Sequence, residues 1–211
     1  MGKTNIRKKM LQKRMLLSFK EMHEMEMSIL SAFQERSSVF SKKTVALYAD
    51  FKNEVPTLSL FTYLTSIDCP VVYPKNYFMP SKSGKYDARA SARGIRFYGV
   101  DKLSALEKGP CGILEPKYDA PEVRFSDIDV FIVPAIVFDK RGFRIGYGAG
   151  CYDKVFSKLK DLSSDRQKFL MGLAYDFQIV DYFEEEKHDI PVSSILTEKR
   201  WLECQEGSLW N

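Results

Sequence analysis

Short apolar runs alternate with helix-like patterns along most of the chain. Runs that are rich in β-branched and aromatic residues and bounded by polar residues are typical of buried strands. By this criterion we predict strands over residues 44–49, 70–73, 95–100, 130–133, 169–174 and, as a short edge strand, 194–197. The spacing of amphipathic helices marks residues 3–20, 22–36, 57–66 and the stretch that follows Gly150. This alternation predicts an α/β fold with a mostly parallel sheet.

Two parts of the chain lack such a pattern. Residues 77–96 are rich in Ser, Lys, Arg and Gly, and we expect a flexible loop over about 80–93. Residues 198–211 are expected to form a tail. Pro134 should end the strand before it, because proline has no N–H to donate to a ladder. The polar tetrad Asp139–Gly142 has the composition of a turn.

Length and composition fit one domain that spans residues 1–211. The chain has 45% hydrophobic residues, enough for a substantial core. Its 32 basic and 28 acidic residues leave a net charge of only +4, which argues against a dedicated nucleic-acid-binding protein. The four cysteines lack metal-ligand spacing and indicate free thiols in a reducing compartment. No stretch has the length of a signal peptide or a membrane span, so we expect a cytoplasmic protein without membrane contact.

The segment from residue 144 to 153 carries the clearest candidate chemistry. Arg144 precedes glycines at every second position, Gly146, Gly148 and Gly150, and a helical pattern follows. Glycine lets a ligand approach the main chain, and the first N–H groups of a helix attract anions. Arginine can add a bidentate contact to phosphate. The spacing is neither that of a P-loop nor that of a dinucleotide fingerprint. The alternative interpretation is a flexible glycine loop before a helix capped by Asp153.

The first predicted helix carries seven basic residues before any acidic one. On a helix, Lys3, Arg7 and Arg14 lie within about 40° of one another. The adjacent apolar seam consists of Ile6, Met10 and Leu17. The helix can therefore dock through this seam while its cations face a neighbouring site. The alternative is a solvated basic face.

The run from Val133 to Asp153 reads VP-x4-D-x2-G-x-R-x-GYG-x-G-x-YD. It closely resembles the signature of the 5-formyltetrahydrofolate cyclo-ligase family, also called 5,10-methenyltetrahydrofolate synthetases. Ala135, Ala149 and Cys151 depart from that signature, which typically has glycine, glycine and tyrosine there. The resemblance implies a three-layer α/β/α domain of the ribose-phosphate-isomerase/CoA-transferase-like type, with a ligand site beyond the carboxyl ends of the strands.

Shorter segments extend the resemblance over most of the chain. They are Lys3–Arg7, Glu54 with its neighbours, Gly112–Pro116, Tyr175–Gln178 and the pair His188–Asp189. Taken alone, Glu54 is also consistent with an acidic residue near a helix N-terminus. For Glu115, a structural role and a ligand contact are equally open.

The resemblance implies an ATP-dependent ligase. Such an enzyme converts 5-formyltetrahydrofolate to 5,10-methenyltetrahydrofolate, with release of ADP and phosphate, through a phosphorylated formyl intermediate. The expected ATP-binding residues are Lys3, Arg7, Arg144, Gly146, Tyr147, Gly148, Ala149, Gly150 and Tyr152, with Lys3 and Arg144 catalytic. The expected folate-binding residues are Glu54, Arg7, Tyr147 and Tyr152. Mg²⁺ is expected on Asp153 and Asp189, because it prefers hard oxygen ligands.

Two other functions remain open at this point. A non-catalytic folate- or nucleotide-binding paralogue is favoured by the departures Ala149 and Cys151. An RNA-binding protein would act through the basic helix and residues 82–96, but the chain lacks an interleaved aromatic and basic module. Lys82, Lys85, Arg89 and Arg93 form a hypothetical site for the polyglutamate tail of folates. We expect a monomer or a weak homodimer.

Overall fold

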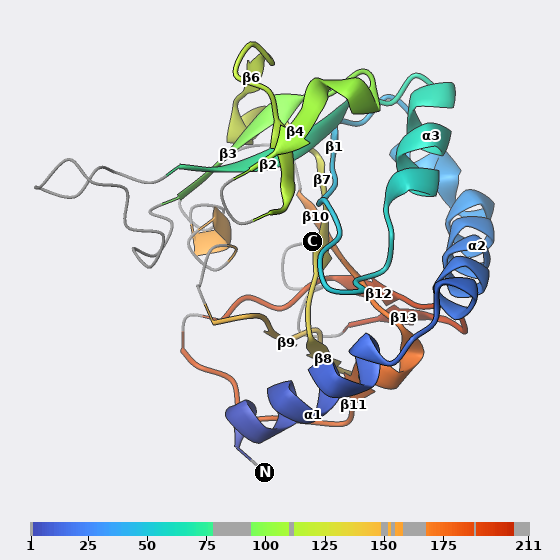
Figure 1. Cartoon of the computed structure of the whole chain (residues 1–211), viewed down its shortest axis with the longest axis vertical. Coiled ribbons are helices and arrows are strands. Elements are labelled where there is room, and N and C mark those ends of the chain that lie inside the picture. Colours follow the sequence, from blue (N-terminus) through green and yellow to red (C-terminus); the bar gives the residue numbers. More distant parts are fainter. Residues whose placement is uncertain are drawn as a thin grey trace, which may run out of the picture.

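The computed structural model describes residues 2–77, 94–109, 112–148, 152, 155–157, 168–187 and 189–204. Within these residues the largest sheet has the strand order β13-β12-β10-β7-β1-β2-β3-β6 (Figure 1). Its strands are β1 (Val45–Ala46), β2 (Val71–Tyr77), β3 (Gly94–Gly99), β6 (Glu122–Val123), β7 (Val130–Pro134), β10 (Phe169–Leu173), β12 (Ser194–Leu196) and β13 (Trp201–Glu203). The strands from β12 to β2 are parallel to one another, and β13, β3 and β6 pair antiparallel. The predicted α/β fold with a mostly parallel sheet is confirmed.

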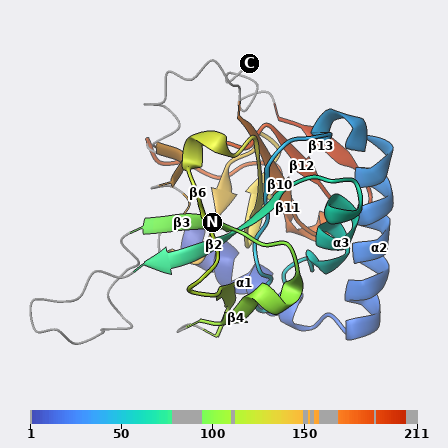
Figure 2. The same cartoon turned by 90° about the horizontal axis from the view of Figure 1, so that it is seen from above.

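Helices and smaller sheets surround this sheet. The helices are α1 (Lys3–Met15), α2 (Phe19–Glu35) and α3 (Leu58–Ser66), with 3₁₀ turns at Ser37–Phe40, Leu103–Ala105, Phe125–Asp127 and Asp176–Gln178. One small sheet contains β8 (Val137–Asp139), β9 (Arg144–Ile145) and β11 (Ile179–Val180), and another pairs β4 (Leu106–Lys108) with β5 (Leu114–Pro116). Helices α2 and α3 lie side by side against one face of the main sheet (Figures 1 and 2).

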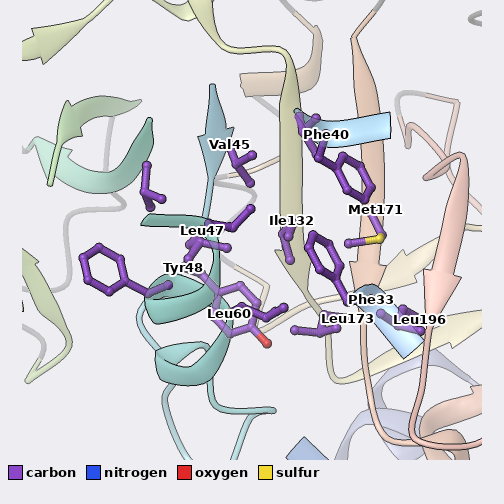
Figure 3. Packing of buried hydrophobic residues seen from close by; sticks show 14 of the residues in the cluster. Phe33, Phe40, Val45, Leu47, Tyr48, Leu60, Ile132, Met171, Leu173 and Leu196 are labelled. Atoms are coloured by element: carbon purple, nitrogen blue, oxygen red, sulfur yellow. The ribbon is translucent and has the colours of Figure 1, made fainter. Parts of the chain in front are cut away.

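The central strands of the main sheet are buried on both faces, which explains their continuous apolar runs. Val130 and Ile132 of β7 face the side covered by α2 and α3, where they pack with Phe33 and Leu60 (Figure 3). The alternate residues of β7 face the opposite side. There they pack with Val155 and Phe156, which are helical. Described helical residues therefore lie on both faces of the sheet, as three layers require.

Helix α1 lies at the end of the molecule where the small sheet of β8, β9 and β11 is found (Figure 1). Ile6 and Met10 pack against the apolar cluster of that small sheet, as their place in the predicted seam suggests. Leu17 packs elsewhere, against the cluster under α2 and α3. Arg7 and Arg14 of α1 are thereby held beside the segment that follows β9.

The single helix predicted over residues 3–20 is wrong at its end. Helix α1 stops at Met15, and α2 begins after Ser18. A capping box starts α2: the Glu21 N–H donates to Ser18 Oγ (3.3 Å), and the Ser18 N–H donates to Glu21 Oε2 (2.8 Å). These bonds satisfy backbone N–H groups that have no partner within the helix at its first turn. They mark Ser18 as the start of a second helix, separate from α1.

Two strand predictions and the predicted tail need correction. The strand predicted over residues 44–49 is shorter as β1, although the Leu47 N–H still donates to Val72 O (3.0 Å). The strand at residues 194–197 is not an edge strand, because β13 pairs with β12 on its outer side. The expected tail from residue 198 therefore contains a strand, Trp201–Glu203. The turn predicted at Asp139–Gly142 is confirmed and joins β8 to β9.

None of the helices in the described part of the chain combines the length and the apolar character needed to cross a bilayer.

Candidate active site

The candidate site lies where the strand order of the main sheet reverses. β1 has β2 on one side and β7 on the other. The chain leaves β1 through α3 to reach β2, whereas it leaves β7 in the opposite direction along the sheet to reach β10. The segments that leave the carboxyl ends of β1 and β7 therefore diverge at one point. In open α/β sheets, ligands bind outside the carboxyl ends of the strands at such a point.

The glycine segment after β9 leaves its main chain open. Gly148 has φ +95°, a conformation that favours glycine. Among the described residues, a Cβ atom at Gly146 would meet no heavy atom within 4 Å, and one at Gly148 would meet only Arg7 Nη2, at 3.9 Å. Protein packing therefore does not demand glycine at position 146, whereas close approach of a ligand to the backbone would. Ala149, Gly150 and Cys151 lie outside the described residues.

Two predicted cations of α1 have partners in this part of the molecule, Arg7 in the glycine segment and Lys3 in residues 186–189. The Arg7 Nε–H donates to Gly146 O at 2.8 Å. Lys3 Nζ donates to Asp189 Oδ2 and to Glu186 Oε1, both at 3.2 Å. Partial burial lowers the pKa of Lys3, but its hydrogen bonds and charge interactions with the two carboxylates outweigh burial and raise that pKa. Lys3 is therefore a charged ammonium at neutral pH.

Arg144, at the start of β9, contacts the residue that follows Asp189. Its Nη1 donates to Ile190 O at 3.0 Å, and its guanidinium carbon lies 4.8 Å from the centre of the Phe156 ring. Ile190 directly follows Asp189, the partner of Lys3. The structure thus brings Arg7 to the glycine segment, and it brings Lys3 and Arg144 to the adjacent residues Asp189 and Ile190.

Arg14, which the sequence placed on the same helix face as Lys3 and Arg7, is buried with 1% of its surface exposed. Its Nε donates to Lys52 O (2.9 Å) and its Nη1 to Ala135 O (3.2 Å). Its Nη2 donates to the Tyr147 hydroxyl and lies 3.9 Å from Glu54 Oε1. One guanidinium therefore joins the segments after β1, β7 and β9.

Glu54 is 5% exposed and lies in the segment that follows β1. Burial, opposed by the charge of Arg14 and by a hydrogen bond from the Phe51 N–H (3.0 Å), raises the pKa of its carboxyl to about 7. Lys52 and Asn53, just before it, have φ +50° and +57°. Such strained backbone is concentrated at functional sites. Asn53 Nδ2 donates to Arg14 O (3.3 Å) and Leu17 O (3.4 Å), which helps to hold it.

Tyr147 connects the Glu54 segment to the glycine segment. A side-chain hydrogen bond links it to Glu54, and its ring lies 6.0 Å from that of Phe51. Lys52 Nζ lies 5.6 Å from the centre of the Tyr147 ring. Burial and the charge of Glu54 raise the pKa of Tyr147 to about 12, so its hydroxyl is protonated. The residue is nevertheless 42% exposed, which leaves part of it accessible to a ligand.

The remaining predicted residues are less tightly grouped. Tyr152 packs against the core on the Phe156 side, with ring centres 5.8 Å apart. Asp153 and His188 lie outside the described residues, as do Cys111, residues 80–93 and the cations at positions 82, 85, 89 and 93. No group of three or more His, Cys, Asp or Glu side chains that suits a metal ion occurs among the residues for which side chains are described.

Two further segments of the family signature have structural roles. Asn76 Nδ2 donates to the buried Glu115 carboxylate at 3.1 Å, and the Asn76 N–H lies 3.4 Å from the same oxygen. These bonds favour the structural interpretation of Glu115. Gln178 is buried and donates to Ala135 O (2.9 Å) and Ile136 O (3.0 Å).

Sequence reasoning missed Arg14 and the segment formed by Phe51, Lys52 and Asn53. The shared helix face of Arg14, Lys3 and Arg7 was the available signal. It did not distinguish a buried arginine from one that faces solvent.

Comparison with known proteins agrees with this geometry. The family model described as "5-formyltetrahydrofolate cyclo-ligase family" matches residues 1–198. The chain belongs to the 5-formyltetrahydrofolate cyclo-ligase family. It is 27% identical over 191 residues to the Escherichia coli K12 5-formyltetrahydrofolate cyclo-ligase, with 88% of this chain and 94% of that protein covered. It is 31% identical over 189 residues to the Mycoplasma pneumoniae cyclo-ligase, with 88% and 92% covered.

Solved structures of cyclo-ligase-family proteins share the fold. The structure of Aquifex aeolicus 5,10-methenyltetrahydrofolate synthetase superposes with a TM-score of 0.77 at 29% identity, with 97% of this chain and 94% of that chain covered. The chain is thus an enzyme of the cyclo-ligase kind.

Proposed function

We propose that this enzyme closes 5-formyltetrahydrofolate to 5,10-methenyltetrahydrofolate at the expense of ATP, releasing ADP and phosphate. Family membership supports the ligase activity, and cyclo-ligase activity implies ATP as co-substrate. The observation that carries the proposal is the contact of Arg7 with Gly146 O beside the open main chain at Gly146 and Gly148. Lys3 and Arg144 contact the neighbouring residues Asp189 and Ile190. Such a group of cations and exposed backbone suits a polyphosphate.

The proposed reaction has two steps. The formyl oxygen attacks the γ-phosphorus of ATP, the bond from that phosphorus to ADP breaks, and ADP leaves. N10 of the folate then attacks the activated formyl carbon, the carbon–oxygen bond to phosphate breaks, and N10 gives up its proton. Phosphoryl transfer asks the protein mainly for positioning and for stabilisation of negative charge. In this proposal Lys3, Arg7 and Arg144 supply that charge stabilisation.

The folate would lie toward Glu54. A buried carboxylate accepts hydrogen bonds from the N–H groups of a pterin. The exposed part of the Tyr147 ring offers a flat apolar surface beside it. Tyr147 belongs to the glycine segment and contacts Glu54, so it would lie where folate and nucleotide meet. The role proposed for Tyr152 is at the border of this site, beyond its packing on Phe156.

Mg²⁺ would be held mainly by the nucleotide. Mg²⁺ usually keeps several waters and binds through one or two carboxylates together with substrate phosphates, so a cage of protein ligands is not required. Asp189 would be one such carboxylate, together with Asp153, and both assignments stay predictions. Asp189 fits this role only in part, because Lys3 already lies 3.2 Å from its Oδ2. When bound, the ion would neutralise charge on the phosphates.

The test is a spectrophotometric assay for 5,10-methenyltetrahydrofolate with the purified chain, 5-formyltetrahydrofolate, ATP and Mg²⁺. The proposal predicts absorbance growth that depends on every component. If both substrates bind and no product forms, the chain is a non-catalytic paralogue. If neither binds and RNA does, the basic face has a different role.

A further inference from the structure

The burial of Arg14 is not explained by packing alone. Well-packed apolar residues often stabilise a core as much as a buried ion pair or more, so a fully buried guanidinium is weak evidence for a stabilising role. Arg14 also lies in the last turn of α1, where a hydrophobic residue would continue the seam that docks on the small sheet. Yet its side chain donates to three acceptors, one from each of three separate segments.

All three acceptors belong to the edge of the candidate site. Lys52 O lies two residues from Glu54, Ala135 O follows β7, and the Tyr147 hydroxyl belongs to the glycine segment. The main chain of Arg14 acts on the same place, because its carbonyl accepts from Asn53 Nδ2. The strained turn before Glu54 is thus held from two sides by one residue of α1.

We propose that Arg14 is the residue that positions the folate-binding groups: it holds the Glu54 carboxylate and the Tyr147 hydroxyl in one fixed arrangement and ties the Glu54 segment to the glycine segment. This inference rests on the proposed function of the site. Arg14 is buried and acts through Glu54 and Tyr147, without contact with the substrate. A lysine could keep the charge, but its single ammonium cannot reproduce the planar fork that reaches three separate acceptors.

The ionisation of Glu54 gives this role a measurable signature. Burial raises the pKa of Glu54, and the charge of Arg14 opposes that rise. Loss of Arg14 should therefore raise the pKa further and move the acid limb of the pH profile to higher pH. The other titratable and charged groups that act on this site are Asp50, Tyr48, Tyr147, Tyr175 and Lys52. These groups are present in the wild type and in the Arg14 variants. A shift of the acid limb of the pH profile between these proteins therefore reports on Arg14.

The experiment is a double-mutant cycle with Arg14→Met, Glu54→Gln and the double variant. The Michaelis constants for 5-formyltetrahydrofolate and ATP, kcat and the pH profile of kcat/KM are measured for each protein. For Arg14→Met we expect the KM for the folate to rise about tenfold or more, a larger change than in the KM for ATP. In the Glu54→Gln background, the same Arg14 change should have a much smaller effect, because the group through which Arg14 acts is already altered.

Three further variants complete the experiment. Lys9→Met removes an exposed cation from the same helix and should leave all constants unchanged. Arg14→Lys should recover part of the affinity for the folate and return the acid limb toward the wild-type pH. Tyr147→Phe should raise the KM for the folate and move the acid limb upward, because it removes a hydrogen bond that lowers the pKa of Glu54. Since Tyr147 is partly exposed, this variant tests the inference even if Arg14→Met does not fold.

The inference is overturned if Arg14→Met lowers activity by the same factor in the wild-type and Glu54→Gln backgrounds, or if Arg14→Met and Tyr147→Phe leave the acid limb unmoved. A wild-type chain that does not convert 5-formyltetrahydrofolate would instead refute the proposed function itself. Comparison of wild type and variants therefore separates the two failures.

Discussion

Replacement of Glu54 by glutamine should stabilise the folded chain above neutral pH while it weakens catalysis. Burial raises the pKa of this carboxyl from 4.5 to about 7 in the folded state. A carboxyl whose pKa is higher in the folded than in the unfolded chain binds its proton more tightly when folded. The contribution of Glu54 to the free energy of unfolding is therefore fully present below the unfolded-state pKa. It is lost as the pH rises from that value to the folded-state pKa.

The size of this effect follows from the shift. Each pKa unit corresponds to about 1.36 kcal/mol, so a shift of roughly 2.5 units costs about 3 kcal/mol once Glu54 is ionised in both states. The side chain is almost fully buried, so solvent screening reduces this free-energy cost only slightly. Glutamine has nearly the same shape and stays neutral, so it avoids the cost. Catalysis should nevertheless fall about 10- to 100-fold, because a hydrogen bond to a charged group contributes about 1.5–3 kcal/mol.

The assay is urea unfolding of wild type and Glu54→Gln at several pH values from about 5 to about 8, with linear extrapolation to water. We expect a small difference in the free energy of unfolding at the lowest pH and a difference of about 3 kcal/mol in favour of the variant at the highest. Glu24→Gln, whose side chain is 63% exposed, is the matched control and should show no such trend. A difference that does not change with pH refutes the burial argument. A stabilised variant with wild-type turnover refutes the folate-binding role.

Further substitutions test other parts of the site. Arg144→Ala should lower kcat by about 10²–10³ in steady-state assays, and a loss below about fivefold would remove Arg144 from the catalytic set. Gly148→Ala should raise the KM for ATP, because φ +95° is strained for alanine and the new methyl group would approach Arg7; an unchanged KM would show that this turn does not bind the nucleotide. Asp139→Ala should cost about 2–4 kcal/mol of stability in urea unfolding, because the Arg141 and Phe143 N–H groups lose the buried carboxylate that accepts from them, whereas the Arg141 guanidinium keeps Glu185; a loss below about 1 kcal/mol would contradict that role.

The central strands could be predicted from the sequence because burial on both faces leaves a continuous apolar run. Val130 to Val133 is such a run, and its alternate residues pack in two different clusters. The short strand at Trp201–Glu203 has no such run, since Glu203 is exposed and, among the described strands, it pairs with β12 alone. The S-x-x-E pattern of a capping box at Ser18 indicates the break between α1 and α2. The helix-like spacing of apolar residues on both sides of Ser18 favoured one continuous helix instead.

The contact of Arg7 with the glycine segment could be anticipated from a helix face and a family signature. The burial of Arg14 could not, because it depends on where β1, β7 and β9 end relative to α1. Helix periodicity places Arg14 beside Arg7, yet only the tertiary arrangement decides that Arg7 donates to Gly146 O while Arg14 is enclosed by three other segments.

The central claim is that cations of α1 and the open main chain after β9 together drive the folate closure with ATP. The most direct test is the ratio of ADP to 5,10-methenyltetrahydrofolate formed by wild type, by a Lys3→Ala/Arg7→Ala double variant and by Lys9→Ala. We predict one ADP for each product molecule in wild type and in Lys9→Ala, and loss of both products in the double variant. Product formation without ADP, or equal turnover by all three proteins, would contradict the account.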